Sequence, residues 1–248
     1  MKADSATQLR LLDVQALDTS VAQLAHRRRT LPELAVIAAR DQRLGELADD
    51  VVRAQTEIAD LDHQQRRLEA DVEQVRGRSD RDRQRLDSGA ITSSNELQQL
   101  QHEVQTLARR QGELEDQVLE LMERREGAAA GLSRVRAEVD QLSGERDEAV
   151  AARDAAFAEI DAGTERRQTE RAALVADIPA DLLALYEKIR AGSGGTGAAA
   201  LRQRRCEGCR LDLSGTDLMH AKNAAPDEVL RCEECRRILV RTPESGLT

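Results

Sequence analysis

Apolar residues recur at alternating steps of three and four along residues 97–142, and the alternation does not slip. Only Gln111 and Arg125 interrupt the stripe. An α-helix has about 3.6 residues per turn, so a strict period of 3.5 keeps one stripe facing a partner only if the helices supercoil. The pattern therefore predicts one strand of a coiled coil. Its positions are Leu97, Leu100, Val104, Leu107, Gln111, Leu114, Val118, Leu121, Arg125, Ala128, Leu132, Val135, Val139 and Leu142.

The partner helix is predicted just upstream, because residues 44–75 show the same alternation, broken only at Gln65. The turn 88–93 separates the two helices and contains Gly89. A link this short makes consecutive long helices antiparallel neighbours. We therefore expect helices over residues 31–87 and 94–176, with Ser93 and Glu96 forming a capping box at the start of the second.

Two further helices are expected, over residues 5–29 and 179–191. Pro32 interrupts the helical hydrogen-bond ladder after the first helix, and Thr30 with Glu33 has the spacing of another capping box. Pro179 suits the first turn of the last helix. The first helix should lie opposite the end of the third, where the apolar stripe weakens and arginines such as Arg146 and Arg167 replace leucines. Residues 1–191 are thus predicted to be a coiled-coil helical hairpin.

Composition supports a narrow helical interface rather than a thick globular core. The chain has 248 residues with one Phe, one Tyr and no Trp, and 33% of its residues are charged. Residues 196–248 hold nine basic and eight acidic residues, so the helical part carries −10 of a total net charge of −9. No signal peptide or membrane span is visible, and we expect a cytoplasmic protein without membrane association.

The glycine-rich segment 192–197 is expected to be a flexible linker or a glycine-rich loop that marks the domain boundary. It does not resemble a phosphate-binding loop, because no Lys-Ser/Thr pair follows it and no strand is expected before it. Residues 198–248 then form the second predicted domain.

The chemistry of that domain is carried by its four cysteines, which form two C-x-x-C pairs: Cys206, Cys209, Cys232 and Cys235. Two such pairs can complete the tetrahedral S₄ site that Zn²⁺ favours in closed structural centres. Short strands are expected over residues 198–204, 228–231 and 237–241, with a brief helix from Ser214 to Lys222, which is the layout of a zinc ribbon. Disulfides, a redox dithiol or an iron centre are the alternatives, but a reducing compartment and the lack of aromatic residues favour zinc.

A basic face on this ribbon is the second candidate site. The arginines proposed to contact a partner or nucleic acid are Arg202, Arg204, Arg205, Arg210, Arg231, Arg236 and Arg237. The alternative is a solvated small domain, since acidic residues such as Glu207, Glu233 and Glu234 lie among them. No catalytic set is visible, because the four histidines are scattered and no nucleotide or protease motif occurs. We expect no enzymatic activity and no small-molecule substrate.

Three segments make the chain resemble a bacterial family of C4-type zinc ribbon proteins with an N-terminal coiled-coil hairpin, in its actinobacterial form. They are residues 27–34, residues 88–97 and the two cysteine knuckles with residues 231–240. The resemblance covers nearly the whole chain. It implies a mainly α fold, in which a long antiparallel helical hairpin is followed by a small β zinc ribbon with one structural Zn²⁺. It also implies adaptor or chaperone-like relatives that bind an alternative sigma factor, secretion components or messenger RNA.

Two functions follow as hypotheses. The first is a non-enzymatic adaptor that mediates protein–protein interactions, related to transcription or secretion. The second is a nucleic-acid-binding regulator that uses the basic ribbon. The partner, the oligomeric state and the orientation of the ribbon on the coil stay open at this point.

Overall fold

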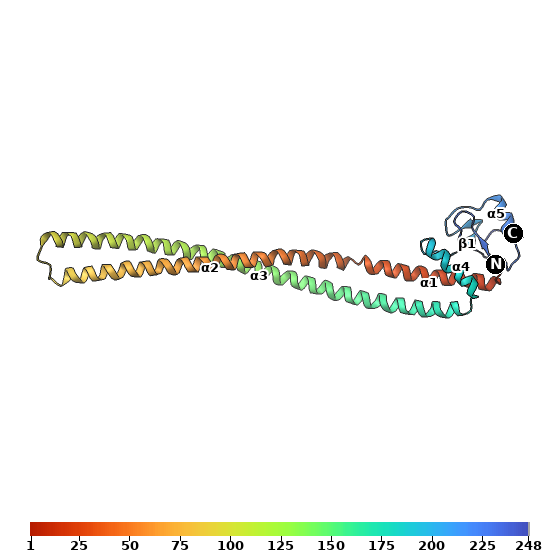
Figure 1. Ribbon diagram of the computed structural model, residues 1–248, viewed down its shortest axis with the longest axis horizontal. Coiled ribbons are helices and arrows are strands. Elements are labelled where there is room, and N and C mark those ends of the chain that lie inside the picture. Colours follow the sequence, from red (N-terminus) through yellow and green to blue (C-terminus); the bar gives the residue numbers. More distant parts are fainter. Residues whose placement is uncertain (248) are drawn as a thin grey trace. The chain divides into compact units, whose positions relative to one another are not determined.

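The structure is a computed structural model that describes residues 1–247. Along the chain its elements are α1 (Ser5–Arg29), α2 (Pro32–Asp87), α3 (Ser94–Ala176), α4 (Ala180–Gly192), β1 (Ala198–Arg202), β2 (Arg205–Cys206), α5 (Gly215–Asn223), β3 (Leu230–Arg231) and β4 (Ile238–Arg241) (Figure 1). The predicted fold class, a long helical hairpin with a small C-terminal β region, is confirmed. The chain divides into two compact units, one formed by Ala35–Ala149 and the other by Met1–Leu34 together with the chain from Val150 onward.

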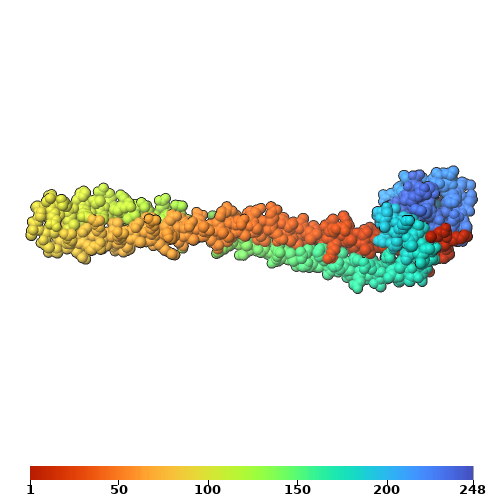
Figure 2. Space-filling model, in the orientation of Figure 1, coloured from red at the N-terminus to blue at the C-terminus, as the bar shows by residue number. Residues whose placement is uncertain are grey.

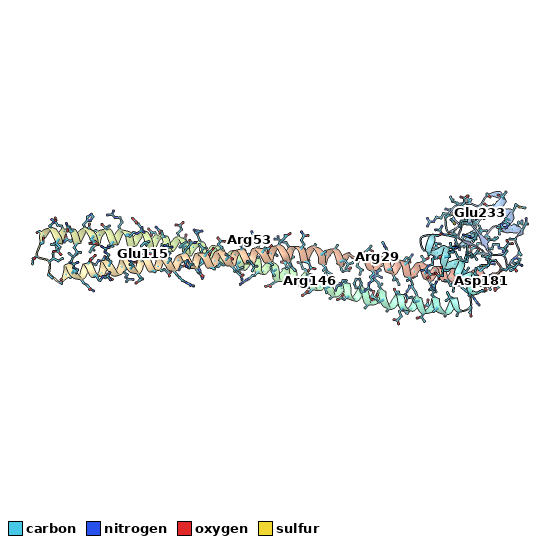
Figure 3. All side chains as sticks on the ribbon, in the orientation of Figure 1. Arg29, Arg53, Glu115, Arg146, Asp181 and Glu233 are labelled. Carbon is cyan, nitrogen blue, oxygen red and sulfur yellow. The ribbon has the colours of Figure 1, made fainter. Side chains whose placement is uncertain are left out.

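The unit Ala35–Ala149 contains nearly all of α2 and the part of α3 up to Ala149, which lie side by side and antiparallel as the 3.5-residue period predicts (Figure 1). Leu47 and Leu61 on α2 and Leu114 on α3 are buried at predicted interface positions. Arg125, one of the two polar interruptions in the stripe of α3, donates a hydrogen bond across to Asp62 on α2. Figure 3 shows the charged side chains lining both helices. Exposed ion pairs of this kind contribute at most about 1 kcal/mol each, so the buried leucines hold the pair together.

The helix bounds agree with the sequence prediction to within one residue, but the capping between α1 and α2 differs from it. The expected capping box of Thr30 and Glu33 does not form, because the Thr30 hydroxyl donates back to the carbonyl of His26 at 3.0 Å. Thr30 therefore closes the C-terminus of α1 instead of opening α2, which begins at Pro32. At the start of α3 the Ser93 hydroxyl accepts a long hydrogen bond of 3.5 Å from the backbone N–H of Glu96.

The other unit contains a four-stranded sheet with the strand order β2-β1-β4-β3. The central strands β1 and β4 are parallel, and each pairs antiparallel with its short outer strand. The strand expected over residues 198–204 ends early, because Gln203 and Arg204 adopt φ values of 49° and 66° and form the tight turn between β1 and β2. Positive φ at both turn residues matches the twist of a two-residue hairpin.

Both faces of this sheet are covered, as its alternating side chains require. Ile238 and Val240 of β4 face α1 and α4, where they join a cluster with Leu11, Leu182 and Tyr186. The intervening side chains enter a second cluster with α5 and two of the cysteines. That cluster consists of Ala199, Leu201, Cys206, Ala221, Leu230, Cys232 and Leu239. The ribbon therefore shares a hydrophobic core with the helices of its own unit.

The N-terminal residues extend this contact. The backbone N–H of Ala3 donates to the carbonyl of Asp227 at 2.8 Å, and Lys2 pairs with Asp227 through its side chain at 3.0 Å. Figure 2 shows the first residues, in red, against the blue C-terminal part. The ribbon thus contacts both the beginning of α1 and the hydrophobic face of α4.

The glycine-rich segment between α4 and β1 is a loop that is hydrogen-bonded to α1. Gln15 of α1 donates to the carbonyl of Gly195 at 3.0 Å and accepts from the backbone N–H of Gly197 at 2.7 Å. A Cβ on Gly197 would lie 2.7 Å from both the ring and the carbonyl oxygen of Tyr186. Close backbone packing, rather than flexibility, thus explains the glycine at position 197.

Among residues 1–247, no helix carries a stretch of sufficient length and hydropathy to span a lipid bilayer.

Candidate metal centre

The two cysteine knuckles are built alike. In each, the backbone N–H of the residue after the second cysteine donates to the carbonyl of the first cysteine, from Arg210 to Cys206 at 2.7 Å and from Arg236 to Cys232 at 2.8 Å. Arg210 and Arg236 both adopt the left-handed conformation, with φ of 63° and 61°. Because the same turn forms in both knuckles, the two sulfurs of each C-x-x-C pair point in the same direction. The spacing of two residues between the cysteines allows this turn.

An arginine in front of each knuckle stabilises this turn. Arg205 Nε donates to the carbonyl of Arg210 at 2.7 Å, and Arg231 Nε donates to the carbonyl of Arg236 at 2.9 Å. A non-glycine residue with positive φ is sterically disfavoured, so these bonds help to hold a conformation that the chain would otherwise avoid. Each knuckle is thus a six-residue unit with arginine at both ends.

The four sulfur atoms converge from the two knuckles. Cys206 Sγ lies 3.9 Å from Cys235 Sγ, Cys209 Sγ lies 3.9 Å from Cys232 Sγ, and all four atoms lie within 4.8 Å of one another. A tetrahedral Zn²⁺ with bonds of about 2.3 Å places its sulfur ligands about 3.8 Å apart, whereas a disulfide needs about 2.05 Å. The residues therefore fit one zinc ion with four thiolate ligands, and the geometry excludes disulfides in this state.

The surroundings of the thiols show why a cation is needed. Burial raises the pKa of Cys206 and Cys232, and the N–H groups of the knuckles only partly offset it. Burial acts in the same direction on Cys235, but hydrogen bonds from Arg237, Cys232 and Cys209 together outweigh it and lower the pKa to about 7. Four neighbouring thiolates are unfavourable without a compensating positive charge, which the metal ion supplies.

Comparison with known families agrees with this geometry. The model of the C4-type zinc ribbon domain matches residues 205–239, which include all four cysteines. The model of the CT398-like coiled coil hairpin domain matches residues 14–194, well over half of the chain. The chain belongs to the CT398-like coiled-coil hairpin family. The predicted resemblance and the single structural zinc are both confirmed, and neither matching model describes an enzyme.

Relatives of this hairpin family support the assignment over almost the full length. An uncharacterized protein of Mycobacterium tuberculosis is 39% identical over 241 residues, covering 97% of this chain and 98% of its own length. A solved structure from Mycobacterium smegmatis is 40% identical, with a TM-score of 0.85, and covers 97% of this chain and 100% of its own. The structure of CT398 from Chlamydia trachomatis shares the fold, with a TM-score of 0.69 and 17% identity. The match covers 96% of this chain and 98% of the CT398 chain.

Among the seven arginines of the predicted basic face, Arg237 has a different role. Its guanidinium donates to the carbonyls of Ser193, Thr196 and Gly208 at 2.8, 3.1 and 3.2 Å. A Cβ on Gly208 would lie 2.8 Å from Arg237 Cδ, so the side chain packs directly on the first knuckle. Arg237 therefore joins the glycine-rich segment to the metal centre and is half-buried. Charge reversal at this position would disrupt the fold, so it does not isolate a partner contact.

The other six arginines are exposed. Arg202 pairs with Glu244 at 2.7 Å and Arg236 pairs with Glu233 at 3.1 Å. Arg204 donates to the carbonyl of Gly246 at 3.3 Å. The remaining three, Arg205, Arg210 and Arg231, lie at the ends of the two knuckles and complete the set.

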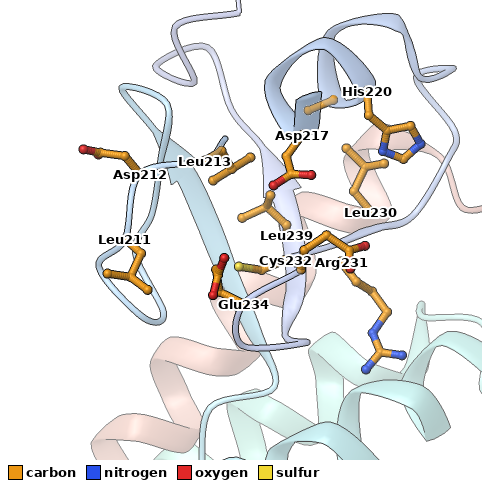
Figure 4. A pocket seen from close by; sticks show the side chains of 12 residues that line it. Leu211, Asp212, Leu213, Asp217, His220, Leu230, Arg231, Cys232, Glu234 and Leu239 are labelled. Carbon is orange, nitrogen blue, oxygen red and sulfur yellow. The ribbon is translucent and has the colours of Figure 1, made fainter. Parts of the chain in front are cut away.

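A small cavity lies beside the second knuckle and is shown in Figure 4. Leu230, Leu239 and Cys232 form its inner wall, and Asp217 of α5 and Glu234 lie at its edge (Figure 4). Its volume is about 20 Å³, which is enough for about one water molecule. This cavity is too small to bind a small-molecule substrate.

Sequence reasoning missed a buried polar cluster in the same unit. Asp18 of α1 is 3% exposed and accepts a hydrogen bond of 2.7 Å from the hydroxyl of Tyr186 on α4. Arg171 of α3 donates to both oxygens of Asp18, at 2.7 and 3.3 Å, and Arg190 Nε lies 3.3 Å from it. The only signal in the sequence was the single tyrosine, because an aspartate in a charge-rich helix is ordinarily solvent-exposed.

Proposed function

We propose that this protein is a non-enzymatic cytoplasmic adaptor that binds protein partners through its helical hairpin and its zinc ribbon. The closed metal centre carries the proposal. The four cysteine sulfurs would fill the four positions of a tetrahedral zinc and leave no site for substrate or an activated water. The metal in such a centre stabilises a small fold and takes no part in catalysis.

Exposed apolar side chains support protein binding rather than catalysis. Several large apolar side chains are exposed on both the hairpin and the ribbon. On the hairpin they are Val36, Val52, Leu97, Leu119 and Met122, and on the ribbon they are Leu211 and Met219. Of these, Leu119 and Met122 lie one turn apart on α3, and exposed apolar groups that cluster often bind other proteins. Long paired helices provide a large rigid surface on which such contacts can be placed.

Site-specific photocrosslinking in living cells tests the adaptor function. A photoreactive residue replaces Leu119 on the hairpin or Leu211 on the ribbon of the full-length, zinc-loaded protein, with exposed Asp13 of α1 as the control position. We expect defined protein adducts from Leu119 and Leu211 that are absent from the control. If neither position gives an adduct above the control, the adaptor proposal is wrong.

A second candidate function is nucleic-acid binding by the ribbon, and the placement of the knuckle arginines favours it. Arg205, Arg210, Arg231 and Arg236 occupy equivalent exposed positions at the ends of the two knuckles. Four cations in this arrangement could contact phosphates, although the thiolate-bound zinc adds negative charge between them.

Salt dependence separates this function from pure protein binding. Affinity for a nucleic-acid duplex should fall steeply as salt rises, and the slope should decrease by about one for each phosphate contact that is removed. The test variants are R210Q and R236Q, with R29Q on α1 as the matched control. Absence of binding at low salt, or equal slopes in all three variants, would reject nucleic-acid recognition.

A further inference from the structure

An apolar groove lies between α2 and α3, in the half of α2 nearer the turn that joins the two helices. It measures about 460 Å³ and is lined by Glu69, Val72, Glu73, Glu115, Val118 and Leu119. All of these residues belong to the unit Ala35–Ala149, so the groove is formed within one compact unit. Leu119 is 57% exposed and Met122, one turn further along α3, is 39% exposed. Two large apolar side chains on one stripe of α3 thus remain in contact with water beside the groove.

The two glutamines that interrupt the coiled-coil stripes bind two of the carboxylates at the edge of the groove. Gln65 donates to Glu69 at 2.7 Å, and Gln111 donates to Glu115 at 2.8 Å, each one turn along its own helix. Glu115 is labelled in Figure 3. Both donors are neutral amide groups, so neither bond pairs the carboxylate with a cation. Glu73 lies 3.8 Å from Arg76, at the outer limit of an ion pair.

The apolar side chains inside the groove and the carboxylates along its edges together indicate which ligand would fit it. Val72, Val118 and Leu119 offer an apolar strip, and the carboxylates of Glu69, Glu73 and Glu115 flank it on both helices. A helix that places leucine-type side chains in the groove and lysine or arginine on either side would satisfy both features. A second copy of this chain is disfavoured, because it would bring the same three carboxylates together in a protein whose net charge is already −9.

We propose that this groove binds an amphipathic helix with basic flanks from a partner protein. The inference rests on the proposed adaptor function and specifies one docking surface for it. The glutamines at positions 65 and 111 then have a role that helix pairing alone does not give them: they hold the rim carboxylates in place.

Fluorescence anisotropy with a designed peptide tests the groove. The probe is a labelled helical peptide of about 18 residues, or five turns, with leucines on one face and lysines on both sides of that face. A scrambled peptide of the same composition is the peptide control. We expect saturable binding of the amphipathic peptide to the full-length, zinc-loaded protein, no saturable binding of the scrambled one, and weaker binding at high salt.

Matched variants locate the binding. L119N should weaken the peptide about tenfold, since it removes an exposed apolar side chain that the peptide would cover. V52N removes a similarly exposed side chain elsewhere on α2 and should leave the affinity within about twofold. The double variant E69Q/E115Q should reduce the salt dependence, whereas D71N, on the opposite face of α2, should not.

Peptide binding that survives both L119N and E69Q/E115Q would overturn the groove proposal. A dimer in sedimentation that L119N dissociates would overturn it as well, because a second copy would then be the occupant. Neither result affects the crosslinks from Leu211 on the ribbon, so the groove and the adaptor function can fail separately.

Discussion

The buried cluster around Asp18 gives the sharpest prediction, and the replacement D18N tests it. The Asp18 side chain is only 4% exposed, and it accepts hydrogen bonds from Tyr186 and Arg171 with Arg190 3.3 Å away. Asparagine keeps the shape but has one acceptor oxygen and an NH₂ group, so it faces hydroxyl and guanidinium donors with a donor of its own.

The magnitude follows from what is lost. A hydrogen bond to a charged group contributes about 1.5–3 kcal/mol, and removal of one partner from a buried ion pair costs about 3–5 kcal/mol. The loss here is at the lower end, because Arg171 also donates to Glu187 and the side chains of Arg171 and Arg190 are 22% and 31% exposed. We expect the free energy of unfolding of this unit to fall by about 3 kcal/mol.

The single tyrosine provides a local assay. Tyr186 is the one tyrosine of the chain and there is no tryptophan, so intrinsic fluorescence reports on the cluster alone. Urea unfolding of the zinc-loaded protein, followed by this signal, should show a midpoint lowered by about 1.5 M if m is about 2 kcal/mol per M. D13N, five residues earlier on α1 and exposed, should shift the midpoint by less than about 0.3 M.

Equal midpoints for D18N and D13N would refute the reasoning. They would mean that the two arginines find other partners or water without cost, and that Asp18 does not hold α1 to α4. A lowered midpoint for D13N as well would indicate a general effect of charge on α1 rather than the buried contact.

Three further predictions concern the same unit. G197A should lower the free energy of unfolding by about 2 kcal/mol in a urea titration, because its Cβ would overlap Tyr186, while G192A, with open space around it, should change it by less than about 0.5 kcal/mol. Chelation of the roughly one equivalent of zinc should change the tyrosine fluorescence and leave most of the helical circular dichroism, and an unchanged fluorescence after zinc loss would contradict the shared core. Burial, and next the hydrogen bond to Asp18, raise the pKa of Tyr186 above its ordinary value of 10.0. The folded state therefore favours neutral tyrosine, and this stabilisation is complete below pH 10 and is lost as pH rises through the higher folded pKa. Tyrosinate absorbance should therefore appear together with unfolding above pH 10, and a reversible titration of the folded protein near pH 10 would disagree.

The sequence by itself determined the helical hairpin and the metal centre, because both depend on local patterns. A 3.5-residue apolar period needs only neighbouring residues to specify a coiled coil, and a turn of a few residues makes the pairing antiparallel. Two C-x-x-C pairs likewise carry their geometry with them, so the four ligands could be identified without the fold.

Only the tertiary structure decided how the ribbon is attached to the helices of its unit. Gly197 resembles a linker residue in composition, yet it is packed against Tyr186 and bonded to Gln15 from a helix about 180 residues earlier. Arg237 resembles a surface cation, yet three carbonyls from two segments bind it. Contacts of this kind join residues that are distant along the chain, and no local periodicity or spacing encodes them. The same reason applies to Asp18, whose burial follows from packing of α1, α3 and α4 around it and not from its own helix.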